Sequence, residues 1–111
     1  MAAYVKNRQL RDELIKSKEL GELTPECLRM FQLISEKLSM KLTNKRFEDR
    51  QDCIQGGVID GWTYWRGYDA SVSLNAFSYM TQVIKNGQFK QLRKINPHKM
   101  QFISINNIYT L

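Results

Sequence analysis

Residues 24–42 read TPECLRMFQLISEKLSMKL and carry the strongest helix signal in the chain. Thr24 places a hydroxyl at the N-cap position, and Pro25 follows at the first helical position, where its missing N–H removes no hydrogen bond. Apolar residues then recur at intervals of three and four, at Leu28, Phe31, Ile34, Leu38 and Leu42. This spacing predicts one apolar face on a helix of about 17 residues.

Helices are also predicted on both sides of this segment. Residues 7–20 are rich in strong helix formers and end at Gly21, a typical stop signal. Residues 43–46 are polar and predict a joint before a third helix. Acidic residues near the start of that helix complement the positive end of the helix dipole. They are Glu48, Asp49 and Asp52.

The third helix combines an apolar line with several glycines. The apolar line consists of Cys53, Ile54, Val58, Trp62 and Trp65, and the glycines are Gly56, Gly57 and Gly61. Glycine inside a helix costs about 1 kcal/mol relative to alanine. We therefore expect these glycines either to allow a close helix–helix approach or to mark a bend around a partner.

A fourth helix is predicted from Ala76 to about Ile95, after a polar loop over residues 70–75 in which Ser73 or Asn75 can cap the helix. Its buried side is expected to hold Phe77, Met80, Ile84 and Leu92. Its solvent side is expected to hold Gln82, Lys85, Asn86, Phe89, Lys90 and Arg93. Pro97 ends the helix, and the β-prone tail that follows is compatible with a hairpin, an extended packing arm or a docking peptide.

These elements predict a single all-α domain of 111 residues, a compact bundle of about four helices with a short β-prone or extended C-terminal tail. The N-terminal helix occupies residues 1–23, the central helices residues 24–96 and the tail residues 97–111. Apolar residues make up 42% of the chain and charged residues 25%, which is ordinary for a globular protein.

Several classes of protein do not fit this composition. No apolar run approaches the roughly 20 residues that a membrane span needs, and the N-terminus lacks the apolar core of a signal peptide. Cys27 and Cys53 are expected to be reduced core thiols in the cytoplasm. Because these cysteines and the single His98 form no ligand cluster, we expect no metal and no cofactor. No nucleophile–base arrangement is evident, so an enzyme is not expected.

Positive charge is concentrated near the C-terminus. Residues 70–111 contain no acidic residue, and their cations are Lys85, Lys90, Arg93, Lys94 and Lys99. They supply most of the net charge of +6, and aromatic residues alternate with them. A basic, aromatic-bearing surface is typical of proteins that bind exposed nucleic-acid bases.

Two motifs in register resemble a known family. The run DCIQGGVIDG (52–61) resembles the second characteristic region of bacterial sigma factors, where an Asp-x-Ile-Gln-x-Gly pattern opens the helix that grips the clamp coiled coil of RNA polymerase. The run FSYMT (77–81) resembles the start of the sigma promoter-melting helix. The short length is similar to that of the late-transcription sigma factors of T-even-like phages, including cyanophage relatives.

The resemblance implies a polymerase-facing surface made of Asp49, Asp52, Gln55, Val58, Asp60 and Trp62. Gly56 departs from the family, because primary sigma factors usually have an acid at that position. The alternative is a core helix with a solvated acidic start.

The resemblance also implies a set of DNA-binding residues on the fourth helix. They are Tyr79, Thr81, Gln82, Lys85, Asn86, Phe89, Lys90, Arg93 and Lys94. Tyr79 would stack on a base flipped out of the melting promoter, and Asn86 would read an adenine edge. Gln82 and Val83 stand where primary sigma factors carry a tryptophan pair, so weaker melting of an easily opened promoter is expected. Simple packing is the alternative for Tyr79 and Phe89.

We therefore expect a phage-encoded sigma factor that binds host core RNA polymerase through its clamp coiled coil. It would recognise and help to melt an A/T-rich promoter element through the non-template strand, in the cytoplasm of the infected bacterial cell. A phage sliding clamp or a coactivator is a further candidate partner. The main alternative is an adapter or inhibitor that contacts the clamp without reading DNA. A DNA-binding repressor is a third, although no helix-turn-helix is evident.

Overall fold

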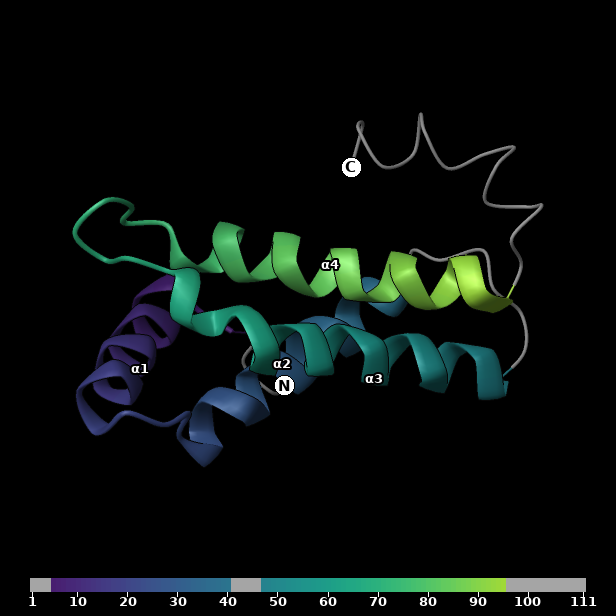
Figure 1. The fold of residues 1–111 in the computed structure, drawn as a ribbon, viewed down its shortest axis with the longest axis horizontal. Coiled ribbons are helices and arrows are strands. Elements are labelled where there is room, and N and C mark those ends of the chain that lie inside the picture. The colour runs from purple at the N-terminus through teal and green to yellow at the C-terminus, as the bar shows by residue number, and fades with distance from the viewer. Residues whose placement is uncertain (1–4, 41–46, 96–111) are drawn as a thin grey trace.

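The computed structural model describes residues 5–40 and 47–95, which form four α-helices (Figure 1). In chain order these are α1 (Asn7–Leu20), α2 (Pro25–Ser39), α3 (Phe47–Tyr64) and α4 (Ala76–Ile95), with a short 3₁₀ turn, η1 (Trp65–Gly67), after α3. α3 and α4 lie side by side and antiparallel, α2 packs against both, and α1 covers the end where α3 connects to α4 (Figure 1). The predicted all-α bundle is confirmed, and the described residues contain no strand.

Local signals set the ends of α1 and α2. Gly21 adopts a left-handed conformation, with φ 81°, and its N–H donates to the carbonyl oxygens of Ser17 and Lys18. Thr24 accepts a hydrogen bond at Oγ1 from the Cys27 N–H, 3.2 Å away, so the predicted N-cap is confirmed. The helix that follows is slightly shorter than predicted. Leu42 and the joint at residues 43–46 lie outside the described residues.

Two asparagines cap the start of α4. Asn75 Oδ1 accepts from the Ser78 N–H at 2.9 Å, so Asn75 is the cap of the two residues, Ser73 and Asn75, that the sequence offered. Asn7 Oδ1 accepts from the Phe77 N–H at 2.9 Å, and Asn7 Nδ2 donates to the Leu74 carbonyl oxygen at 3.1 Å. Asn7 therefore joins the start of α1 to the start of α4, although the two segments are far apart in the sequence.

Side chains from all four helices fill the core. Its fully buried members include Leu10, Leu14, Phe31, Ile34, Tyr68, Met80 and Ile84. Cys27 and Cys53 are both buried, as expected of core thiols. The apolar line predicted on α3 divides between two surroundings, because Trp65 is buried whereas Trp62 is 60% exposed. Gly61 faces Phe31 in α2, and each residue of a helix turns by about 100°, so the following residue points outward.

Glycines allow α3 to approach its neighbours closely. A Cβ atom at Gly56 would lie 3.0 Å from the carbonyl oxygen of Gly87, and one at Gly57 would lie 2.8 Å from Cγ2 of Ile84. Of the two roles predicted for these glycines, close helix–helix approach is therefore confirmed. None of the helices in the described residues combines the length and the apolar character needed to cross a membrane. Pro97, His98 and the tail lie outside the described residues.

Candidate nucleic-acid groove and partner surface

A groove of about 550 Å³ lies between α3 and α4, and we call it the α3–α4 groove. It is lined by Asp60 and Tyr64 of α3 and by Tyr79, Val83, Asn86, Phe89, Lys90 and Arg93 of α4. Spacings of three and four residues place these α4 positions along one side of the helix. The groove therefore combines aromatic rings, an amide, one carboxylate and two cations.

An ion pair crosses the groove from α3 to α4. Lys90 Nζ lies 2.9 Å from Asp60 Oδ2, and the exposed fractions of the two side chains are 48% and 13%. The same ammonium lies 5.2 Å from the centre of the Tyr64 ring, within cation–π range. The hydrogen bond that Lys90 donates to the Asp60 carboxylate raises the pKa of Lys90 above its usual value. Sequence reasoning placed Asp60 among the polymerase contacts and Lys90 among the DNA contacts. The placement of Asp60 is therefore corrected, because its carboxylate faces α4.

The aromatic rings of the groove differ in exposure. Tyr64 is 50% exposed, and Tyr79 is half-buried with its ring centre 5.6 Å from that of Tyr68. A side chain at Gly67 would overlap the Tyr79 hydroxyl, so this glycine leaves room for the ring. Phe89 was predicted on the solvent side but is only 6% exposed. Its ring lines the groove together with residues of α3, so it lies where the two helices pack and not on the outer side of α4.

The remaining residues predicted to bind DNA also differ in how exposed their side chains are. Gln82 and Asn86 are exposed, and Gln82 Nε2 donates to Asn86 Oδ1 at 3.0 Å. Arg93 and Lys94 are exposed near the end of α4, whereas Lys85 is half-buried. The hydroxyl oxygen of Thr81 is buried, so this threonine does not offer its hydroxyl to a ligand in this conformation.

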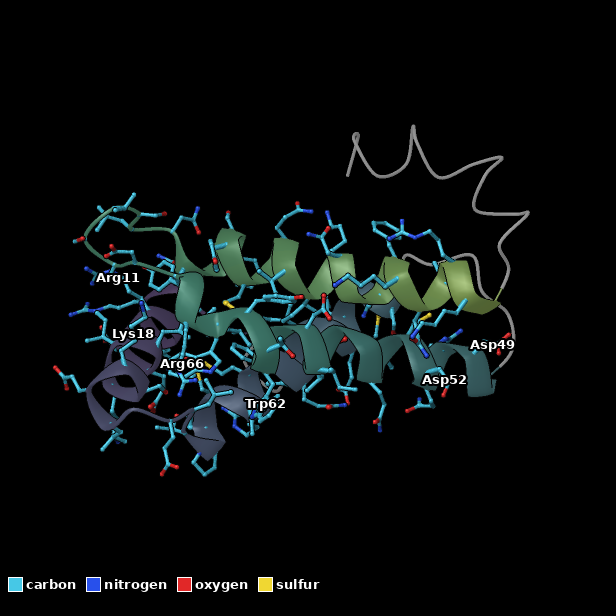
Figure 2. The ribbon with its side chains drawn as sticks, viewed as in Figure 1. Arg11, Lys18, Asp49, Asp52, Trp62 and Arg66 are labelled. Atoms are coloured by element: carbon cyan, nitrogen blue, oxygen red, sulfur yellow. The ribbon has the colours of Figure 1, made fainter. Side chains whose placement is uncertain are left out.

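A second surface lies on the outer side of α3. Asp52, Gln55, Ile59 and Trp62 are all exposed and follow one another at intervals of three and four, and we call them the α3 outer stripe. Trp62 is 60% and Ile59 57% exposed. Figure 2 shows Asp49 and Asp52 near the start of α3 and Trp62 nearer its end. Asp49 and Val58, also predicted to contact polymerase, are half-buried.

Sequence reasoning missed Tyr64 and Ile59. Tyr64 stands four residues after Asp60 and therefore on the same side of α3. Ile59 stands three residues before Trp62, and its exposure adds a second apolar group to the stripe. Each of them could have been identified from the sequence, because each lies three or four residues from a residue that was predicted to be functional.

The side chains of the groove are of kinds that can bind nucleic acid. Aromatic faces can stack on bases, and the cations can bind phosphate. In residues 5–40 and 47–95, no group of three or more His, Cys, Asp and Glu side chains is placed to hold a metal ion. Comparison of the chain with protein-family models, curated proteins and solved structures finds no match.

Proposed function

We propose that this protein is a compact, phage-encoded sigma factor that binds host core RNA polymerase and helps to open an A/T-rich promoter element. It acts by binding energy alone, in the cytoplasm of the infected cell. The observation that carries the proposal is the α3–α4 groove, in which half-exposed Tyr64 and half-buried Tyr79 stand beside the exposed cation Arg93.

The groove fits an unpaired strand better than a closed duplex. Each base of a single strand has a flat face that can stack on tyrosine, and such stacking contributes about 1–3 kcal/mol per base. In a duplex these faces are covered by neighbouring bases. Exposed Asn86 adds an amide that is able to pair with an adenine edge. These features support capture of the non-template strand after melting.

The α3 outer stripe supports a protein partner. A large exposed aromatic residue flanked by polar groups is typical of the residues that dominate interfaces. Asp52 and Gln55 offer hydrogen-bond acceptors to basic side chains, while Ile59 and Trp62 offer apolar area. We assign this stripe to the clamp coiled coil of the polymerase. A sliding clamp or a coactivator would then bind elsewhere on the chain.

The proposal is tested by run-off transcription with host core polymerase on a template that carries an A/T-rich upstream element. A transcript with a fixed start that requires the chain is the expected result. Tyr64→Ala should reduce permanganate reactivity of the promoter while polymerase still co-purifies with the protein. Absence of any chain-dependent transcript would overturn the sigma-factor assignment.

An adapter or inhibitor of polymerase is the second candidate. One observation favours it: Asp60 engages Lys90, which leaves the groove less positive than the sequence alone indicates. Such a protein would co-purify with core polymerase through the α3 outer stripe, produce no transcript of its own and reduce transcription by other sigma factors. The same run-off assay separates the two functions.

A further inference from the structure

The Asp60–Lys90 pair gives the two groove cations different surroundings. The Asp60 side chain is only 13% exposed, so its interaction with Lys90 is screened less than that of a pair fully in water. Gly87 helps to bring Asp60 against α4, since a Cβ atom at position 87 would lie 2.8 Å from Cβ of Asp60. Arg93 is exposed one turn beyond Lys90 on the same side of α4.

We propose that Asp60 withholds Lys90 from phosphate and that Lys90 acts instead as a positioning residue for Tyr64. This inference rests on the proposed binding of a DNA strand in the groove. Lys90 Nζ is held at once by the carboxylate, at 2.9 Å, and by the Tyr64 ring, at 5.2 Å, so it ties the half-exposed ring to α4. Arg93 is then the phosphate contact of the groove.

Because of this division of roles, the two cations of the groove should affect the salt dependence of DNA binding differently. A lysine that neutralises a carboxylate displaces no counterion from DNA, whereas a cation that binds phosphate does. Loss of Arg93 should therefore change the salt dependence of binding, and loss of Lys90 should not. Lys90 should instead contribute a salt-independent part of the affinity, because an untethered Tyr64 must be ordered when a base stacks on it.

The test measures binding of a fluorescein-labelled, A/T-rich single-stranded oligonucleotide to the full chain by anisotropy at several salt concentrations. For single strands, each phosphate contact contributes about 0.7 to the slope of log K against log salt. Arg93→Gln should reduce the slope by about 0.7. Lys90→Gln should weaken binding with an unchanged slope. Lys16→Gln, which removes an exposed cation on α1 outside the groove, is the charge-matched control.

Asp60→Asn removes the carboxylate of the ion pair and leaves the Lys90 ammonium in place. It should release Lys90 and steepen the slope by about 0.7, and the double variant Asp60→Asn/Lys90→Gln should restore the original slope. A slope that falls with Lys90→Gln as much as with Arg93→Gln would overturn the inference, even if Asp60→Asn does not fold. Absence of binding by every variant would also overturn it. The run-off assay judges the proposed function separately, so the two failures are distinguishable.

Discussion

Gln88 of α4 donates its side-chain amide to both the carbonyl oxygen and the hydroxyl oxygen of Ser35 in α2, at 2.7 and 2.8 Å. The Ser35 hydroxyl in turn donates to the Ile54 carbonyl oxygen in α3, at 2.8 Å. Gln88 and Ser35 are both buried, so this short chain of hydrogen bonds joins three helices inside the core. A buried polar group that loses its hydrogen-bond partner destabilises the folded state, so substitutions in this network should lower the free energy of unfolding.

Gln88→Leu should lower the free energy of unfolding by about 1–3 kcal/mol, because it leaves buried acceptors of Ser35 without their donor. Chemical denaturation followed by circular dichroism measures the change. Gln82→Leu on the exposed side of α4 is the matched control and should stay within about 0.5 kcal/mol. Equal effects of the two substitutions would show that the buried network does not contribute to stability.

Gly87→Ala should destabilise the fold by about 1–3 kcal/mol, despite the gain in helix propensity. The added methyl group would overlap the Gly56 carbonyl oxygen and press on Asp60, and neither the backbone nor this short side chain can move away easily. Gly67→Ala is the informative comparison. Its nearest neighbour is the Tyr79 hydroxyl, the far end of a movable side chain, so thermal melting should change little while oligonucleotide binding falls.

Trp62→Ala should weaken binding to core polymerase by about 2 kcal/mol or more, as expected for a central aromatic anchor. The side chain is 60% exposed, so the free energy of unfolding should stay within about 0.5 kcal/mol of the wild-type value. Leu20→Ala on α1, where the leucine is 61% exposed, is the exposure-matched control. Co-purification with polymerase that is unaffected by Trp62→Ala would remove the α3 outer stripe from the interface.

The Cys27 thiol should react with thiol reagents only when the protein unfolds. Burial raises its pKa from 9.0 to about 12, so the folded protein keeps the proton where the unfolded chain loses it. The unfolded state then binds fewer protons, and the contribution of Cys27 to stability declines as the pH rises above 9.0 toward about 12. Denaturation at pH 8 and pH 10 should show this decline, and Cys27→Ala should lack that component. Rapid labelling of the native protein at pH 8 would contradict the burial.

The helices were predictable because their signals are local. Thr24 and Pro25 mark the start of α2, Gly21 marks the end of α1, and Asn75 marks the start of α4. A cap forms between residues that are close in the sequence, so the sequence pattern contains the information. The cap that Asn7 provides for α4 was not predictable, because it depends on how α1 packs against the distant start of that helix.

The candidate site was only partly predictable, because some of its contacts lie within one helix and others depend on how two helices pack. Helical spacing placed Asn86, Lys90 and Arg93 together correctly, since that relation lies within one helix. The pairing of Lys90 with Asp60 depends on the crossing of α3 and α4, which no spacing within a single helix specifies. The burial of Phe89 likewise depends on how α4 packs against α3, which the helical repeat of α4 alone does not specify.

α3 carries the groove residues Asp60 and Tyr64 on one side and the stripe residues Ile59 and Trp62 on the other. The angle between the two surfaces is therefore set by the covalent spacing within one helix, at about 100° and 1.5 Å per residue, and no joint intervenes. A partner that tilts the stripe must tilt the groove by the same angle. The orientation in which the α3 outer stripe binds its partner would thus determine the direction in which a DNA strand leaves the groove.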